Sequence, residues 1–315
     1  MNDMTGFPNG ITVRGIPVLG GSKRPFTGNV FYVGATSTNS DMAAGVDNSA
    51  TNGSDPNTPF ATVDYAIDQC VANNNDVIYV LPGHTETVAG ASDWVPKAGS
   101  SIIGLGHGAN RPIITFNATA STVAISAASV HIENLVVKPG IADVVACFVV
   151  TADWASLKDI DVLPNSTYSI KSFATVSAAA SWFQMDGGFH VATTAAGAAA
   201  SWVKITGHAT TSVGHRIRNL RGFLTVAAGA SSGVEVNTTA TVAMFMENCR
   251  LVVSGDGSAV PVTLIGSTGH VAQNYISGTQ TTLANGFVTT SVYGAENYVS
   301  NTANKNGLLT PGVDA

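Results

Sequence analysis

Short apolar runs separated by Gly, Asn, Ser and Thr dominate the chain from about residue 100 onward. Examples are HIENLVV at 131–137, SLKDIDV at 156–162 and FMENCRL at 245–251. Apolar segments of this length, bounded by turn-forming residues, are typical of strands and too short for helices. The pattern therefore predicts an all-β chain built from many short strands.

The polar breaks recur with a period typical of one coil of a β-solenoid. When the segments are aligned on a polar turn residue, successive turns lie 23 to 33 residues apart, and the longer steps contain insertions such as the Ala- and Gly-rich run at 195–200. The aligned turn residues are Asn134, Asp159, Asp186, Asn219, Asn248, Asn274 and Asn297.

Stacking of coils explains this pattern physically. Each strand pairs with the equivalent strands of the coils above and below it. The side chains of Ile132, Leu135 and Val136 are therefore expected to lie in an interior column that all coils share. Asn and Asp suit the corner because they tolerate the left-handed backbone conformation, and stacked Asn amides can bond to one another. A β-sandwich also has Asn at turns, but its strands recur every ~10 residues with tight hairpin signals, which are few here.

One amphipathic helix is expected before the coils, over residues 58–75. Thr58 would cap it, Pro59 would occupy its first position, and three consecutive Asn residues would end it. A strand follows at 76–81 and stops at Pro82-Gly83. We expect coils from about residue 76 to residue 300, within a β-helix domain that spans 30–300.

The two ends and one loop lack the coil pattern. Residues 1–29 are rich in Gly and Pro and are predicted to form an extended arm that lies on a neighbouring subunit or another protein. The loop at 34–57 carries Asp41, Asp47 and Asp55, whose spacing favours a solvated loop over a calcium site. Residues 301–315 are expected to be a tail. Within the arm, the expected partner-binding residues are Phe7, Pro8, Ile11, Val13, Ile16 and Val18.

Composition excludes several classes of function. Charged residues make up only 11% of the chain and the formal net charge is -6, so no basic face for nucleic acid is encoded. The apolar runs are far shorter than the ~20 residues of a membrane helix. The first ten residues have no secretory signal, so we expect synthesis in a host cytoplasm. Cys70, Cys147 and Cys249 are expected to be buried thiols.

Residues 55–116 carry a family resemblance. The segments DPNTPFATVDYAIDQCVANNNDVIYVLPGHTETV and SIIGLGHGANRPIITF resemble the entry into the right-handed parallel β-helix of pectate-lyase-like proteins, particularly those among bacteriophage structural genes. The opening FPNGITVRG is similar to the start of phage virion proteins. The resemblance implies that the helix at 58–75 caps the solenoid. This fold includes both enzymes and scaffolds, so the resemblance leaves the function open.

Candidate catalytic residues are few. A lyase of this kind needs a carboxylate cluster and a base, for which Asp161, Asp186 and Lys158 are the candidates, with Lys171 nearby in sequence. Asp159 and Asp161 are two residues apart and would share one face of a strand, but Asp159 also fits a corner. We favour the structural interpretation. Glu residues that precede the turns are expected to be solvated edge residues: Glu133, Glu247 and Glu296.

Three tryptophans recur in related contexts. Trp154, Trp182 and Trp202 stand in ADWAS, ASWFQ and ASWVK, which predicts aromatic side chains on one outer surface. They could stack on sugar rings or bury against a neighbouring subunit, and we favour the interface. The seven histidines show no metal-binding spacing, and Gly104, Gly106 and Gly108 lack the Lys of a phosphate loop, so no metal and no cofactor are expected.

The sequence as a whole favours a non-enzymatic virion structural protein. We expect a capsid decoration (cement) protein on the capsid surface, a homotrimer whose partners are itself and the major capsid protein. The alternatives are a tailspike-like polysaccharide depolymerase and a carbohydrate-binding tail protein that uses the tryptophans.

Overall fold

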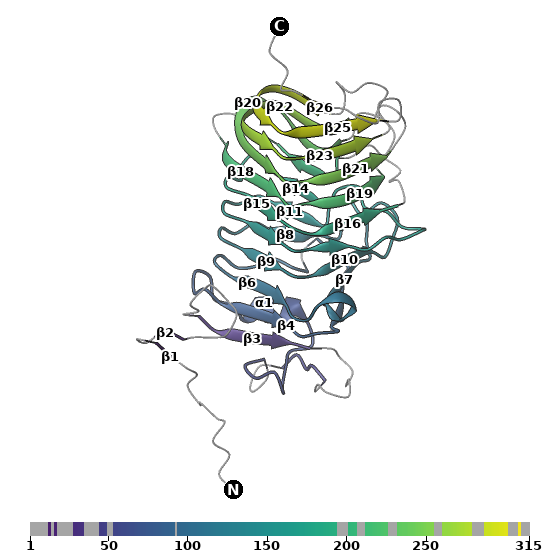
Figure 1. The fold of residues 1–315 in the computed structure, drawn as a ribbon. Coiled ribbons are helices and arrows are strands. Elements are labelled where there is room, and N and C mark those ends of the chain that lie inside the picture. Colours follow the sequence, from purple (N-terminus) through teal and green to yellow (C-terminus); the bar gives the residue numbers. More distant parts are fainter. Residues whose placement is uncertain are drawn as a thin grey trace.

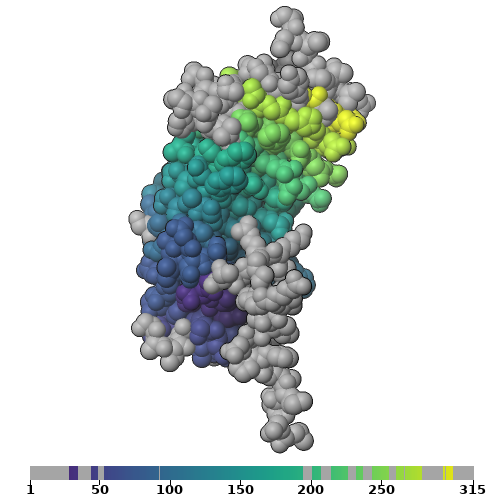
Figure 2. Space-filling model, turned by 90° about the vertical axis from the view of Figure 1, so that its left-hand side faces the viewer, coloured from purple at the N-terminus to yellow at the C-terminus, as the bar shows by residue number. Residues whose placement is uncertain are grey.

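The protein is a parallel β-solenoid, which confirms the predicted fold class (Figure 1). The computed structural model describes residues 12–13, 16–17, 28–34, 44–48, 53–91, 93–193, 201–206, 212–225, 232–254, 260–278, 287–301 and 308–309. Its described coils stack into an elongated rod (Figures 1 and 2). No helix among the described residues is long and apolar enough to cross a membrane.

Each coil contributes strands in three positions, and strands in one position pair in parallel along the rod. The first-position strands are β4 (Val77–Val80), β6 (Ser101–Gly104), β9 (His131–Glu133), β12 (Ser156–Lys158), β15 (Gln184–Asp186) and β18 (Ser212–Arg218). The third-position strands are β8 (Val123–Ile125), β11 (Phe148–Val150), β14 (Ala174–Val176) and β17 (Val203–Ile205).

The second-position strands form a separate ten-stranded sheet. Its parallel members are β5 (Thr85–Val88), β7 (Ile113–Phe116), β10 (Val136–Pro139), β13 (Asp161–Val162), β16 (Phe189–Ala192), β19 (Arg221–Thr225), β21 (Arg250–Ser254), β23 (Tyr275–Gly278) and β25 (Asn297–Asn301). The antiparallel strand β26 (Leu308–Leu309) joins its last edge, within the predicted tail.

Three long strands in the upper coils differ from the expected pattern of short strands. They are β20 (Ser232–Glu247), β22 (Val260–Ala272) and β24 (Phe287–Ala295), and each runs from the third position of one coil into the first position of the next. They merge the first- and third-position strands into one fourteen-stranded sheet. The corner between these positions is therefore replaced by bending strands in the upper coils (Figure 1).

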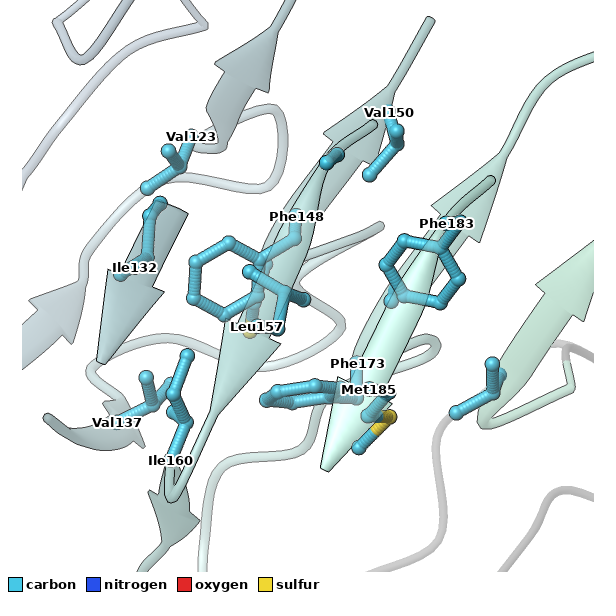
Figure 3. Packing of buried hydrophobic residues seen from close by; sticks show 14 of the residues in the cluster. Val123, Ile132, Val137, Phe148, Val150, Leu157, Ile160, Phe173, Phe183 and Met185 are labelled. Atoms are coloured by element: carbon cyan, nitrogen blue, oxygen red, sulfur yellow. The ribbon is translucent and has the colours of Figure 1, made fainter. Parts of the chain in front are cut away.

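Stacked apolar side chains fill the interior. Ile132 pairs in register with Leu157, and Leu157 with Met185, while Phe148 lies beside Phe173 with ring centroids 5.1 Å apart (Figure 3). Ile132, Leu135 and Val136 are buried as predicted, and so are all three cysteines. Burial raises the pKa of the Cys70 and Cys249 thiols to about 12, which keeps both protonated. The continuous core follows from in-register pairing, because each side chain has its own counterpart directly above and below.

The predicted turn residues adopt the left-handed conformation at four of seven positions. Asn134, Asp159, Asn219 and Asn248 have φ between 48° and 60°. In the other three coils the left-handed residue is the neighbour of the predicted one, namely Gly187, Gln273 and Glu296. The prediction was therefore wrong for Asp186, Asn274 and Asn297 by one residue.

In the upper coils, hydrogen bonds of buried Asn side chains explain why the left-handed residue is the one before the predicted Asn. Asn274 and Asn297 point inward, and the Asn274 side-chain amide donates to Asn297 Oδ1 at 3.0 Å and to the Met246 carbonyl at 3.0 Å. On the outside of the same corner, Asn248 Nδ2 donates to Asn219 Oδ1 at 2.8 Å. The expected Asn stacking is present, in two columns instead of one.

The predicted helix is shorter than expected. Helix α1 spans Val63–Gln69, and its N-cap is Thr62 instead of Thr58. Phe60 pairs with Val33 at the end of β3 (Val30–Val33), so the backbone around Pro59 is used as an extended segment and cannot begin a helix. The helix packs against β3 and β4. Two strands in the predicted arm, β1 (Thr12–Val13) and β2 (Ile16–Pro17), pair in antiparallel fashion. A short 3-10 helix spans Gly108–Asn110, between β6 and β7.

Polar side chains tie the first coils together. Glu86 accepts hydrogen bonds from the Val63 backbone N–H at 2.8 Å and from Trp94 Nε1 at 3.0 Å, and it lies 2.9 Å from His84 Nε2. The Asp47 carboxylate accepts from the backbone N–H groups of Ala61 and Thr62. Asp47 therefore orders the start of the helix, whereas Asp41 lies outside the described residues.

Two buried histidines are held neutral by the core. His190 accepts from Trp202 Nε1 at Nδ1 and donates from Nε2 to the Ile160 carbonyl, which fixes its neutral form. His215 is fully buried, and neither of its ring nitrogens has a hydrogen-bond partner among the described residues. Burial lowers the pKa of each imidazole to about 4.

Acid should therefore weaken the fold between about pH 6.5 and pH 4. Over this range the unfolded histidines bind protons and the folded ones do not, so each contributes stability above pH 6.5 that is lost as the pH falls, on the order of 3 kcal/mol. Replacing His215→Met removes an unpaired buried imidazole beside apolar neighbours. We expect a higher melting temperature at pH 5 and a flatter melting curve against pH. The exposed His107→Met is the control, and equal pH dependence in both variants would contradict this account.

Candidate functional site

Charged side chains form a column on the outer face of the first-position strands. Glu133, Lys158, Asp186, Arg218 and Glu247 stand in register one above another, with alternating sign. Lys158 Nζ lies 2.6 Å from Glu133 Oε1, and Arg218 lies 2.6 Å from Asp186 Oδ2. Opposite charges directly across a strand pair stabilise the sheet. The column therefore joins successive coils.

Two of the three candidate catalytic groups belong to this column. The hydrogen bond to Glu133 raises the pKa of Lys158, so the amine stays protonated and is a poor base. Partial burial alone would raise the pKa of Glu133, but hydrogen bonds from Lys158 and His131 outweigh burial and lower it. Asp186 also accepts from Asn219 Nδ2 at 2.7 Å. Both candidates are thus engaged with neighbours on adjacent coils.

The third candidate, Asp161, is held by a buried arginine. Arg111 pairs with Asp161 and also donates to the backbone carbonyls of Leu135 and Asp159, so one guanidinium spans successive coils. The other Asp161 oxygen accepts from the Phe189 backbone N–H at 2.7 Å. Asp159 lies at the corner and Asp161 begins β13, so the expectation that they share one face of a strand was wrong.

The candidate residues do not converge on one catalytic centre. Asp186 stands in register with Lys158 and not with Asp161, and Gly187 occupies the position above Asp159. Within the part of the chain that the structure describes, no three His, Cys, Asp or Glu side chains lie close enough together to hold a metal ion. Chemically, this arrangement supplies cross-coil ion pairs.

The three tryptophans separate into two environments. Trp154 and Trp182 are 51% and 38% exposed and stack with ring centroids 4.9 Å apart and planes 7° from parallel. Trp202 is 1% exposed and packs beside Phe173 and His190. The prediction of an outer surface was wrong for Trp202. This residue precedes the third-position strand β17, whereas Trp154 and Trp182 precede first-position strands, and its indole N–H donates to the buried His190.

Exposed apolar side chains follow the outer face of the ten-stranded sheet. They occupy two neighbouring outward columns, from the residue after β13 to β25, and each is at least 40% exposed. We call this set the apolar row, and it comprises Leu163, Phe189, Phe223, Val252, Tyr275 and Tyr298. One of these columns also holds Arg221 and Arg250, which stand between Phe189 and Tyr275.

Two further features lie next to the apolar row: the Arg250 side chain and a shallow hollow. The Arg250 guanidinium lies 5.3 Å from the centre of the Tyr275 ring, and Tyr275 stacks on Tyr298 with centroids 4.9 Å apart. Beside the lower end of the row is a shallow hollow, lined in part by Leu163 and Tyr168. Tyr, Phe and Arg are the residue types that protein interfaces favour.

Sequence patterns predict this surface only weakly. Its signal is that aromatic residues recur near the start of four second-position strands. Phe189 and Tyr275 are the first residues of β16 and β23, Tyr298 is the second residue of β25, and Phe223 is the third residue of β19. The strands are only two to five residues long, so inward and outward positions depend on a register that the turn alignment missed by one residue in three coils.

The predicted arm residues are largely beyond what the structure describes. Val13 and Ile16 lie in β1 and β2, which face each other in register. Phe7, Pro8, Ile11 and Val18 lie outside the described residues. Comparison with known proteins adds no further assignment, since no family model, curated protein or solved structure matches the chain.

Neutralising Asp161 should cost stability. Asp161→Asn leaves the Arg111 guanidinium largely buried without its counter-charge, and we expect a loss of unfolding free energy on the order of 2 kcal/mol, measured by denaturant or thermal unfolding. Asp68→Asn is the matched control, because Asp68 is exposed and its ion pair with Lys97 is 3.8 Å long. Equal unfolding midpoints for the two variants would contradict the structural role of Asp161.

Proposed function

We propose that this chain is a non-enzymatic structural protein of a bacteriophage particle, a capsid decoration protein that stabilises the shell. The observation that carries the proposal is the apolar row, a long adhesive surface on a rigid solenoid. Exposed surfaces that combine aromatic side chains with arginines, as this one does with Arg221 and Arg250, are typical of protein interaction sites. The candidate catalytic groups, by contrast, are paired with opposite charges of neighbouring coils.

A second copy of the chain is the proposed occupant of the apolar row. The row runs along the stacking direction of the sheet, so an identical solenoid set parallel to the first offers a row of equal length with the same spacing between coils. Parallel copies turned about a common axis would place matching coils at the same height. We therefore propose a homotrimer in which this face of each subunit points toward its neighbours.

We assign attachment to the shell to the N-terminal arm, residues 1–29. The arm of residues 1–29 leads into β3, where the Asn29 backbone N–H donates to the buried Asp76 carboxylate at 2.6 Å. An extended arm joined to a fixed first coil can lie across several subunits of the major capsid protein. Three arms on one trimer would add their binding energies through effective concentration.

A charge placed in the apolar row should dissociate the assembly. Phe223→Lys replaces an apolar side chain of the contact by a further cation beside Arg221 and Arg250, so we expect a monomer in place of a trimer by size-exclusion chromatography with light scattering at micromolar concentration. Phe245→Lys is the control, because Phe245 is similarly exposed on the other sheet and should remain trimeric. A monomeric wild-type protein, or an unchanged trimer in Phe223→Lys, would contradict the proposed interface.

Removal of the arm should separate binding from folding. A chain that lacks residues 1–29 is expected to lose attachment to decoration-free particles in a co-sedimentation assay. Its circular dichroism spectrum should remain that of a folded solenoid, and its melting temperature should fall only slightly, because the deletion removes the Asn29 backbone bonds to Asp76 and Val77 and leaves the pairing among the later coils unchanged. Unchanged particle binding by the shortened chain would exclude the arm as the attachment element.

A further inference from the structure

Two arginines stand next to each other in one column of the apolar row. Arg221 and Arg250 pair in register on adjacent coils, and both side chains are exposed. Like charges directly opposite each other destabilise a sheet. Among the described residues neither arginine forms an ion pair, although the Arg250 guanidinium lies over the Tyr275 ring. The single chain thus leaves two neighbouring positive charges without a counter-charge on the face that is proposed for subunit contact.

These charges disfavour packing of the apolar row against the same row of another copy. Arg221 and Arg250 lie on β19 and β21, at the middle of the row, with β13 and β16 below them and β23 and β25 above. Rows that overlap fully, whether parallel or antiparallel, would therefore bring arginines against arginines, which is unfavourable across an interface. A ring of parallel copies avoids this contact, because each row then meets a different face of its neighbour.

One carboxylate lies at the height of the two arginines. The chain has only two acidic residues between Arg221 and Arg250, namely Glu235 and Glu247. Glu247 pairs with Arg216 at 2.9 Å, whereas Glu235 forms no ion pair among the described residues. Glu235 lies in the third-position part of β20, between the two arginines along the coil. Since the chain rises steadily from coil to coil, its height on the solenoid axis falls between theirs.

Glu235 is oriented outward and held in place. It stands between the buried Val234 and Val236, so strand alternation directs its side chain to the outer face. The Ser201 hydroxyl donates to one carboxylate oxygen, and the Ser232 N–H in turn donates to that hydroxyl at 3.0 Å. The other carboxylate oxygen has no hydrogen-bond partner in the part of the chain that the structure describes. Glu235 is therefore a preorganised acceptor for a cation from outside the chain.

The face around Glu235 is flat enough to receive the large side chains of the apolar row. Its outward column consists of Ala124, Val149, Thr175, Lys204, Glu235 and Thr263. Apart from the two charged residues, these side chains are short. Lys204 lies one coil below Glu235, at the height just above Phe189, and an aromatic ring accepts a cation on its face.

We infer that the apolar row of each subunit docks on the third-position strands of its neighbour, where the partner's Glu235 lies between Arg221 and Arg250. The inference rests on the proposed homotrimer and specifies its contact. Parallel copies related by rotation about an axis along the solenoid keep each residue at its own height, so the three charges meet. Charge-assisted hydrogen bonds from both guanidinium groups then satisfy the carboxylate. The first-position face fits less well, because its charges already pair with one another.

Charge reversal tests this contact. The full-length Glu235→Lys and Arg221→Glu/Arg250→Glu variants should each form the trimer only at about tenfold higher concentration or more, measured by size-exclusion chromatography with light scattering. The variant that combines all three substitutions restores opposite charges and should recover most of the wild-type association. Glu247→Lys is the control, because Glu247 is paired within its own chain and its variant should remain trimeric. Circular dichroism checks that each variant is folded.

Cross-linking tests which faces meet. Val252 and Thr263 lie in the same coil, on the apolar row and on the third-position face, and the native cysteines are buried. With a short bis-maleimide, Val252→Cys/Thr263→Cys should give covalent trimers, and Val252→Cys alone should give no covalent dimers. Covalent dimers from the single variant, or a trimer that Phe223→Lys dissociates and Glu235→Lys does not, would overturn this inference and leave the proposed trimer standing. A monomeric wild-type protein would overturn both.

Discussion

In-register parallel stacking is the constraint on which the rest of this structure depends. Each residue contacts its counterpart one coil above and one coil below. The side chain that fits at a position is therefore set by the residues stacked with it in the same column. Apolar columns fill the interior, alternating charges from Glu133 to Glu247 stabilise the outer face, and Asn274 and Asn297 satisfy buried backbone groups. At the corner, Trp154 and Trp182 also follow this rule, because they occupy the same column and stack on each other.

The repeat was predictable because the turn imposes a residue type at a fixed step. Asn134, Asp159, Asn219 and Asn248 identify the corner because few other residues accept its backbone conformation. Side-chain direction was less predictable, since Asn274 sits one residue further along and uses its amide inside the core. The start of α1 was missed because Phe60 pairs with β3, a contact that no local signal at Thr58 or Pro59 reveals.

The candidate site was harder to predict for the same reason. Asp161 looked like a free carboxylate, but its partner Arg111 precedes it by fifty residues and reaches it only once the coils are stacked. Trp154 and Trp202 share similar sequence contexts, yet one lies at an exposed corner and the other in the core. These residues can be told apart only by the residues stacked above and below them, and those neighbours are known only once the register of the strands is known. The proposed role as an adhesive scaffold accounts for the apolar row and the paired charges together.

The copy number of this chain in purified particles tests the central claim most directly. Quantitative mass spectrometry of particles, with isotope-labelled peptides from this chain and from the major shell protein, gives the ratio of the two. A decoration protein predicts a ratio close to that of the shell protein. A handful of copies per particle would place the chain in the tail, and its absence from particles would contradict the structural role altogether.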